Sequence, residues 1–351
     1  MLCHEFRTMK MMIDKKPIGE NAPCFIIAEA GSNHNRDFPL ACELIDAAAR
    51  ASADAVKFQL FRGEKHYSRK TPLLPGETIH PVDLLKGLEM PYEWIPKLKE
   101  HARKKEILFF SSVTDYEDVD ALEKNNIGAY KLASFELVDL PLITYTAGKK
   151  KPIILSTGLA NMEEIDDAYQ ACKKAHNDKI VFLQCASVYP SSPEIMNLRA
   201  MHTIQTAFPD TIIGLSDHTI GVHISVAAVA MGAKVIEKHF TLSRSMKGPD
   251  HSFSMEPQEL SELVRQIRDV EKALGDGKKV LPSQEEMVNY YRARRSIHTK
   301  VALPKGTILS PKMFTIKRPG YGIKPKFLDS LTGRAVKRDI EADEWMTWEM
   351  V

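Results

Sequence analysis

The sequence predicts an α/β protein, a (β/α)8 barrel followed by a small, mostly β module, and three observations support this fold. Short apolar runs rich in β-branched and aromatic residues recur eight times before residue 275. Segments with the apolar spacing of amphipathic helices separate these runs. Beyond residue 275 the pattern changes to turn signals, such as Pro-Lys-Gly and Pro-Gly, between short β-prone runs. The 351 residues suit a barrel of roughly 250 residues with a small module attached.

The eight predicted strands are apolar on both faces, which is typical of a parallel sheet covered by helices. They span 24–30, 55–61, 107–112, 129–134, 152–158, 180–187, 211–216 and 234–240. Helical spacing is clearest in 39–52, 163–175, 223–233 and 257–275. Eight such repeats in one chain predict a closed barrel.

The domain organisation follows from the same change of pattern. We expect a catalytic barrel over 1–275, a polar linker over 276–289 and a compact β-rich module over 290–351. A module of this size buries little apolar surface by itself. We therefore expect it to pack on the barrel or on a partner subunit.

The composition excludes several classes of protein. A formal charge of +2 gives no long-range field for nucleic acid. The five cysteines form no CxxC pair and are odd in number, as in proteins with reduced intracellular thiols. No apolar run approaches the ~20 residues of a membrane span, and the first residues lack a signal-peptide core. We expect a cytoplasmic protein that binds neither membrane nor nucleic acid.

Polar residues collect where the predicted strands end. The active site of such a barrel lies at the carboxyl ends of its strands. Every strand contributes to this set, whereas structural polar residues would be scattered over both barrel ends. The set comprises Glu29, Asn33, His34, Lys57, Gln59, Ser111, Ser112, Lys131, Ser134, Ser156, Gln184, Ser187, Tyr189, Ser216, Asp217, His218 and His239.

Lys57 and Lys131 lie inside apolar strands, where a lysine is rarely buried without a partner. A single such lysine suggests a Schiff base or a snorkelling side chain. Two, with a ring of serines, indicate an anion site, because ammonium groups supply charge and hydroxyls supply directed hydrogen bonds. No GxxxxGK[ST] or GxGxxG loop competes for that role.

His218 and His239 follow neighbouring strands and lie near Glu29 in the predicted barrel. Neutral imidazoles beside a carboxylate bind divalent cations, and this ligand set allows Mn²⁺, Zn²⁺ or Fe²⁺. The alternative is that both are ordinary hydrogen-bonded histidines. His34 is a third candidate or a loop-packing residue.

Three other stretches are interpreted as structural. The acidic run 115–118 is expected to start a helix, in preference to binding metal. Arg292, Arg294 and Arg295 are expected to form a solvated or interface cluster. The methionines of MKMMI (9–13) are interpreted as part of a flexible terminus.

Several motifs closely resemble the sialic acid synthase family, which includes N-acetylneuraminate, legionaminate and pseudaminate synthases and related spore-coat polysaccharide enzymes. The motifs are IIAEAGSNHN, DAVKFQ, YKLASFE, PIILSTG, VYP, GLSDHT, IEKHFT, GPDHSFSM and IKRPGYGI, and the resemblance covers about 18–351. The C-terminal module resembles the family's antifreeze-like (SAF) domain. Membership implies a transferase that condenses phosphoenolpyruvate with an N-acylated hexosamine and releases phosphate by C–O cleavage.

The resemblance also implies roles for single residues. The catalytic residues would be Glu29, Lys57, Lys131, His218 and His239, and the two histidines would hold a divalent metal, usually Mn²⁺, with Mg²⁺ or Co²⁺ as alternatives. Phosphoenolpyruvate would contact Lys57, Ser112, Lys131, Ser134, Ser156 and Ser216. The sugar would contact Gln59, Ser187, Tyr189, Asp250 and Arg318. Arg318 would come from the other subunit of a domain-swapped homodimer.

Two departures from the family pattern concern the acceptor sugar. Ser187 stands where sialic acid synthases often carry Asn or Thr, and the 71–85 loop lacks an asparagine that some relatives use. The expected acceptor is N-acetylmannosamine, giving N-acetylneuraminate. The alternative is a legionaminate or pseudaminate synthase acting on a 2,4-diacetamido-6-deoxy hexose. A metal-dependent phosphosugar aldolase and a non-catalytic carbohydrate- or ice-binding protein are the remaining hypotheses.

Overall fold

The computed structural model describes residues 10–73, 78–280 and 282–351. Part of the 71–85 loop, residues 74–77, and Met9 of the MKMMI stretch lie outside the described residues. The chain divides into two compact units, Met1–Gly275 and Asp276–Val351. Among the described residues, no helix is both long and apolar enough to cross a membrane.

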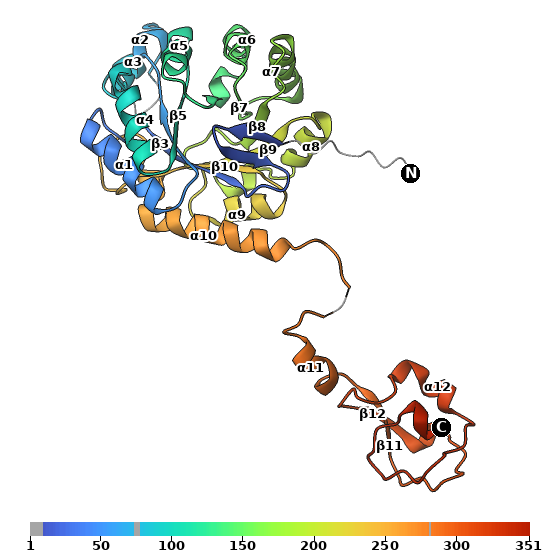
Figure 1. The fold of residues 1–351 in the computed structure, drawn as a ribbon. Helices are drawn as coiled ribbons and strands as arrows, with labels where there is room; N and C mark the ends of the chain where they lie inside the picture. Colours follow the sequence, from blue (N-terminus) through green and yellow to red (C-terminus); the bar gives the residue numbers. More distant parts are fainter. Residues whose placement is uncertain (1–9, 74–77, 281) are drawn as a thin grey trace. The chain divides into compact units, whose positions relative to one another are not determined.

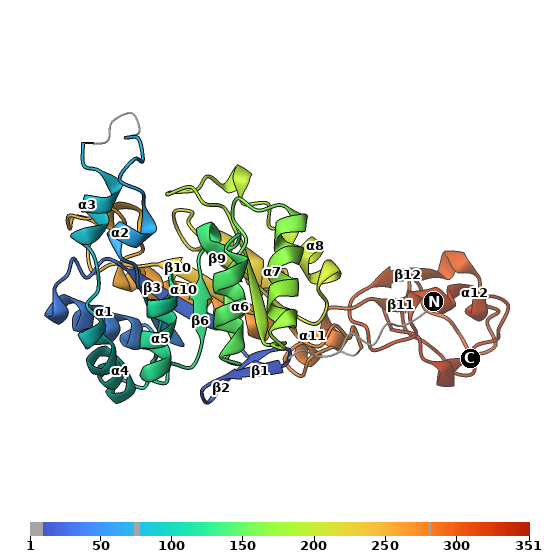
Figure 2. The same ribbon diagram turned by 90° about the horizontal axis from the view of Figure 1, so that it is seen from above.

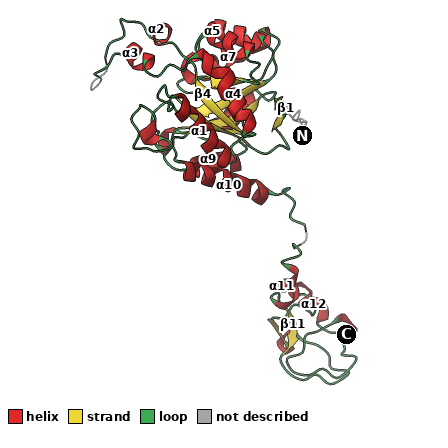
Figure 3. Cartoon of the chain, turned by 60° about the vertical axis from the view of Figure 1, so that its left-hand side comes forward, coloured by secondary structure: helices red, strands yellow, loops and turns green. Residues whose placement is uncertain are grey.

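The first unit is built on a closed barrel of eight parallel strands, which confirms the predicted (β/α)8 fold (Figures 1 and 3). The strands follow one another around the barrel in chain order, and β10 closes against β3. They are β3 (Phe25–Gly31), β4 (Ala55–Gln59), β5 (Leu108–Ser112), β6 (Tyr130–Leu132), β7 (Ile153–Ser156), β8 (Ile180–Cys185), β9 (Ile212–Asp217) and β10 (Val235–His239). All residues of β3 and β10 are buried, which explains why these runs show no polar face.

Helices cover the outside of the barrel. Eight of them alternate with the strands: α1 (Phe38–Arg50), α4 (Ile95–Lys104), α5 (Tyr116–Lys124), α6 (Leu140–Gly148), α7 (Met162–Lys174), α8 (Ala200–Ala207), α9 (His223–Ala230) and α10 (Pro257–Leu274). The short helices α2 (Gly63–His66) and α3 (Pro81–Lys86) pack together in the β4–α4 connection and stand out from the barrel (Figure 2). Asp115 caps α5 by accepting from Glu117 N and Asp118 N, so the expected helix start is confirmed.

A β-hairpin precedes the barrel, formed by β1 (Lys10–Ile13) and β2 (Lys16–Gly19). Met11, Ile13 and Ile18 are buried in the main core, so the interpretation of this stretch as a flexible terminus is wrong for residues 10–13. Two strand-like runs around a turn at Asp14, where φ is 49°, carried the signal.

Asp54 connects this hairpin to both ends of the barrel chain. Its carboxylate accepts from Lys16 Nζ of β2 at 2.8 Å and from the Ile26 backbone N of β3 at 2.9 Å. It also accepts from Arg268 Nη2 of α10 at 3.1 Å. One carboxylate thus joins the first strands to the last helix, beside the seam where β10 meets β3.

The second unit has its own small core of side chains from several short elements. It contains α11 (Met287–Arg292), the antiparallel pair β11 (Ser296–Thr299) and β12 (Phe314–Lys317), and α12 (Leu328–Leu331). Isolated bridges such as Leu303↔Ile340 and Ile308↔Ala335 connect the remaining extended segments. The predicted β-rich module is confirmed, although α11 begins inside the segment expected to be a polar linker.

Candidate active site

Two lysines and a glutamate meet inside the barrel, although their strands are not neighbours. Lys57 Nζ of β4 lies 3.8 Å from Glu237 Oε2 of β10, and Lys131 Nζ of β6 lies 3.6 Å from Glu237 Oε1. Because other strands separate β4, β6 and β10 around the barrel, these contacts must cross its interior. All three side chains are buried. The sequence-predicted lysine pair is therefore brought together at the carboxyl ends of the strands.

Glu29 of β3 completes this charged cluster. Lys57 Nζ lies 2.8 Å from Glu29 Oε2, and Gln59 Nε2 donates to Glu29 Oε1 at 2.9 Å. Burial raises the pKa of Glu29 to about 7, and the nearby Glu237 adds to this rise while Lys57 opposes it. Burial alone would also raise the pKa of Glu237, but Lys131 and Lys57 outweigh it and the pKa is lowered. Glu237 is thus the stable anion, and Glu29 can gain or lose a proton near neutral pH.

The charge balance of this cluster favours an anionic ligand. Burial lowers the pKa of Lys57, but Glu237 and Glu29 raise it further, so the net shift is upward and Lys57 stays charged. Burial lowers the pKa of Lys131, and Glu237 only partly restores it. Two ammonium groups face one ionised carboxylate, Glu237, and a second, Glu29, which is protonated in part of the molecules near neutral pH. Positive charge is left for an anionic ligand whenever Glu29 is protonated.

Serine hydroxyls surround the lysines. Ser112 pairs in register with Lys131, and Ser216 Oγ donates to Glu237 Oε1 at 3.3 Å. The hydroxyls of Ser156 and Ser187 are buried and have no hydrogen-bond partner among the described residues. Buried polar atoms of this kind call for a ligand or an ordered water.

Gly158 allows these serines to approach one another. Its backbone N donates to Ser134 Oγ at 3.0 Å. A Cβ at this position would lie 2.2 Å from Ser187 Oγ and 2.7 Å from Ser134 Oγ. Only glycine leaves room for both hydroxyls here, so the residue after Ser156-Thr157 is required by packing in the site.

The two predicted metal ligands lie side by side. The ring centroids of His218 and His239 are 5.5 Å apart, and Tyr189 packs on His218 at 4.2 Å. His218 Nδ1 lies 2.8 Å from Ala186 O, which places the proton on Nδ1 and leaves Nε2 with a free lone pair. His239 Nδ1 is buried, and no residue in the described part of the chain forms a hydrogen bond with it. Burial, followed by the charge of His218, lowers the pKa of His239 well below 6.5 and keeps it neutral.

These imidazoles fit a divalent cation that takes its other ligands from elsewhere. Within the described ranges, no three His, Cys, Asp or Glu side chains form a group that could hold a metal ion. The protein would therefore contribute two imidazoles, and the remaining positions would stay open to substrate or water. Asp250 Oδ2, 3.9 Å from His239 Nδ1, is the nearest further oxygen that the ion-pair distances identify.

Two of the residues predicted for the sugar, Tyr189 and Asp250, lie beside the histidines, and Phe253 joins them. Phe253 packs against both His239 and Tyr189, with ring centroids 5.3 and 5.6 Å apart. Burial raises the pKa of Asp250 to about 6. Tyr189 is 43% exposed, which makes it the most accessible member of this group.

Arg318 belongs to the second unit. There it lines a cavity of about 680 Å³ together with Arg292, Asn289 and Tyr321. Its predicted contact with the sugar stays a prediction.

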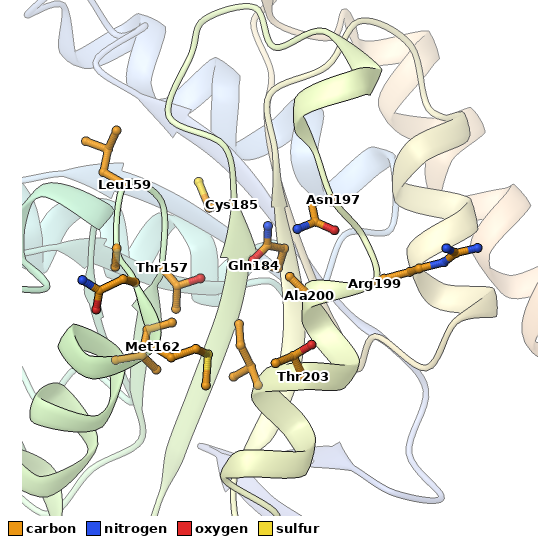
Figure 4. Close-up of a pocket in the computed structure, with 13 residues that line it drawn as sticks. Thr157, Leu159, Met162, Gln184, Cys185, Asn197, Arg199, Ala200 and Thr203 are labelled. Carbon is orange, nitrogen blue, oxygen red and sulfur yellow. The ribbon is translucent and has the colours of Figure 1, made fainter.

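Four polar residues singled out at the strand ends face away from this cluster. Gln184 Nε2 donates to Met196 O at 3.1 Å and lines a separate pocket of about 560 Å³ between α7 and α8 (Figure 4). Ser111 Oγ donates to Phe58 O. His34 packs on Trp94, with ring centroids 5.6 Å apart, so it is the loop-packing residue of the two alternatives. Asp217 pairs with Lys238 on the outer face of the sheet.

Sequence reasoning missed two buried carboxylates. Glu237 stands two residues before His239 on the same strand, and the period of two places both on one face, so this signal was present. Glu136 follows Ser134 in the 3₁₀ turn after β6, and its Oε2 has no hydrogen-bond partner. Burial raises the pKa of Glu136 to about 7. No periodic pattern marks a residue in such a turn.

Comparison with known proteins gives matches to both units. A family model described as the NeuB family matches residues 44–279, and a SAF domain model matches residues 294–351. An N,N'-diacetyllegionaminic acid synthase of Campylobacter jejuni is 41% identical over 91% of this chain and 97% of its own length. Human N-acetylneuraminate-9-phosphate synthase is 39% identical over 95% of this chain and 94% of its own length.

A solved structure is similar as well. The crystal structure of a sialic acid synthetase from Leptospira borgpetersenii covers 81% of this chain and 96% of its own. It superposes with a TM-score of 0.73 at 36% identity.

Proposed function

The chain belongs to the NeuB family and carries a SAF domain, and from this premise we propose that it is a nonulosonic acid synthase. Its reaction would join phosphoenolpyruvate to the open-chain aldehyde of an N-acylated hexosamine, a transferase reaction. The observation that carries the proposal is that Lys57 and Lys131 meet at Glu237 inside the barrel, in the same unit as the adjacent pair His218 and His239.

Phosphoenolpyruvate carries a carboxylate and a phosphate, and the lysine cluster supplies the matching charge. Lys57 and Lys131 would each bind one of these groups, which weakens their present ion pairs to Glu29 and Glu237. Ser112, Ser134, Ser156 and Ser216 would add hydrogen bonds that fix the orientation of the donor. The unpartnered Ser156 hydroxyl supports this assignment, because a bound anion would satisfy it.

In the proposed reaction a C–C bond forms between C3 of phosphoenolpyruvate and the aldehyde carbon of the sugar. Water adds at C2, and one of its protons ends on the former aldehyde oxygen, which becomes a hydroxyl. The bond between C2 and the bridging phosphate oxygen then breaks, the C2 hydroxyl becomes the ketone, and its proton leaves with inorganic phosphate. Glu29 has a pKa of about 7, and its ionised carboxylate would take the proton from the attacking water. Gln59 orients that carboxylate through its hydrogen bond.

His218 and His239 would hold a divalent cation, Mn²⁺ by preference with Mg²⁺ or Co²⁺ as alternatives, which would polarise the aldehyde oxygen of the sugar. The two histidines keep a free nitrogen each for this purpose. Tyr189, Phe253 and Asp250 surround them, and we propose that they, with Gln59 and Ser187, bind the acceptor.

We further propose that the second unit acts in a homodimer, with Arg318 contacting the sugar bound by the partner. Residues 276–351 contain 15 Lys and Arg and 9 Asp and Glu, a formal charge of +6, so residues 1–275 carry −4 of the chain's +2. Opposite net charges favour association of the second unit with a barrel and support this proposal.

The acceptor is tested with a panel of N-acylated hexosamines. Purified protein with phosphoenolpyruvate and Mn²⁺ would receive N-acetylmannosamine, its 6-phosphate or a 2,4-diacetamido-6-deoxy hexose, and released phosphate would be measured. We propose N-acetylmannosamine as the substrate, and mass spectrometry of the product would distinguish N-acetylneuraminate from legionaminate or pseudaminate.

The variant His239→Ala tests the proposed metal site. We expect it to keep its fold and to lose phosphate release. No release with any sugar of the panel would contradict the synthase proposal. Cleavage of a phosphosugar without phosphoenolpyruvate would instead favour the aldolase alternative.

A further inference from the structure

A loop from Thr241 to Ser254 carries Asp250 and Phe253 to the histidines. The loop is closed at its base, where Thr241 N donates to Met255 O at 2.8 Å and Met255 N donates to His239 O at 2.9 Å. Between these bonds the loop contains only short turns, including a 3₁₀ turn at His251–Phe253. The position of Asp250 therefore depends on what holds the interior of the loop.

His251 fills that interior. It is 1% exposed, and its two ring nitrogens have separate partners. Nδ1 lies 2.6 Å from Thr241 Oγ1 at the start of the loop, and Nε2 lies 3.2 Å from Asn35 Nδ2, in the connection between β3 and α1. Because the amide nitrogen of Asn35 donates, Nε2 must accept and Nδ1 must carry the proton. Burial lowers the pKa of His251, which favours this neutral form.

The connection after β3 holds the loop at two further points. Asn35 Nδ2 also donates to Lys247 O at 2.8 Å. Asn33 Nδ2 donates to Phe240 O at 2.9 Å, just before the loop. Gly248 packs closely against His251 and Asn35. A Cβ at this position would lie 2.7 Å from His251 Cδ2 and 3.0 Å from Asn35 Oδ1, so a side chain has no room. Its φ of 152° is also a conformation that other residues rarely adopt.

We propose that Asn35 and His251 are positioning residues that hold this loop so that Asp250 and Phe253 face His239. Neither reaches the lysine cluster through the contacts above. This inference rests on the proposed function. It predicts that Asn35 and His251 control binding of the acceptor sugar and do not affect binding of phosphoenolpyruvate. The proposal also explains the GSNHN stretch. Asn33 and Asn35 hold the loop by hydrogen bonds, and His34 between them packs on Trp94.

The test compares His251→Asn, His251→Gln and Asn35→Ala with wild type. Asn at 251 can keep the bond to Thr241, and Gln can keep the bond to Asn35, so each should retain part of the wild-type behaviour. We expect KM for the acceptor to rise about tenfold or more in Asn35→Ala, with KM for phosphoenolpyruvate within about twofold of wild type. Asn35 is only half-buried, so this variant should fold even if a change at 251 does not.

Asn177→Ala is the control, because Asn177 is also an asparagine whose amide donates to two backbone oxygens, Ala147 O and Lys151 O, in a loop away from the site. It should lower thermal stability without separating the two KM values. Equal rises in both KM values for Asn35→Ala, or no rise with the protein folded, would overturn the proposal.

Hydrogen exchange of residues 241–256 without substrate provides the second measurement. Faster exchange there in Asn35→Ala, with the rest of the barrel unchanged, supports the proposal, and unchanged exchange overturns it. This measurement does not need turnover, so an inactive wild-type protein would count against the synthase assignment alone.

Discussion

Two groups of buried charges lie back to back on strand β10 and are held in different ways. Lys238 faces the helix layer, where its Nζ lies 2.8 Å from Asp217 Oδ2 and donates to Thr219 O at 2.6 Å. Asp217 also accepts from Thr219 and Ser225, so the outer pair is fully hydrogen-bonded. Glu237 faces the interior at longer distances from two lysines, and its Oε2 has no hydrogen-bond partner.

Hydrogen-bond partners distinguish a structural charge from a functional one within a single strand. A buried ion pair with every partner in place holds the backbone in position. A buried cluster with unused hydrogen-bonding capacity is costly unless a ligand completes it. Burial alone does not separate the two groups, since both are almost inaccessible to solvent.

The largest effect is expected on turnover, from Lys131→Met. Removing one ammonium from the inner cluster should lower kcat/KM by roughly a thousandfold, about 4 kcal/mol of transition-state stabilisation. The thermal midpoint should change little, because the loss of a desolvated lysine offsets the loss of one of the two ammonium groups beside Glu237, which keeps Lys57. Steady-state phosphate release and thermal unfolding measure the two quantities.

Lys151→Met, at a lysine paired with Glu123 outside the site, is the control. Full turnover in Lys131→Met would show that the inner cluster does not bind the donor.

The next effect is expected on stability, from Asp217→Asn. This change leaves Lys238 buried without its carboxylate and should cost about 3–5 kcal/mol in the free energy of unfolding. The double variant Asp217→Asn/Lys238→Met should recover most of that loss, because the unpaired charge is gone. Urea unfolding of the two variants checks the comparison. If the double variant were no more stable than the single one, the outer pair would not be a self-contained structural unit.

The smallest effect is a change in the pH dependence of stability. The pKa of Glu29 is raised from 4.5 to about 7, so the folded chain holds this proton where the unfolded chain has lost it. Its contribution to stability therefore decreases as pH rises from about 4.5 to about 7, by up to about 3 kcal/mol. Glu29→Gln should remove this decrease, measured as the slope of unfolding free energy against pH. Glu163→Gln, on an exposed part of α7, should leave the slope as in wild type.

Much of the barrel could be predicted because its strands are short, apolar and rich in β-branched residues. The start of α5 could be predicted from Asp115, whose cap is a local interaction. The hairpin at Lys10–Gly19 was missed because three methionines resemble a terminal tail, although burial of Met11 and Ile13 holds it in place. Tertiary contacts decided that segment.

The site shows the same division between local and non-local information. Period-two alternation is enough to put Glu237 with His239 and to send Lys238 outward. Applied strictly, it would also have separated Ser112 from Ser111 and removed Gln184 from the site. The hydrogen bond between Asn35 and His251 joins residues 216 positions apart in the sequence, and no local sequence pattern predicts it. Arg318 is a stronger case, because its predicted partner is another chain.

The three bonds to Asp54 bear on how such a barrel can be made. The bond between its carboxylate and Arg268 cannot form until the ribosome has added more than two hundred further residues. Until β10 emerges, the newborn chain exposes an open edge at β3. Until Arg268 follows, Asp54 and the hairpin before β3 have only part of their support. The cylinder can therefore close only when its last strand has been made, and the bond from its last helix to Asp54 follows that closure.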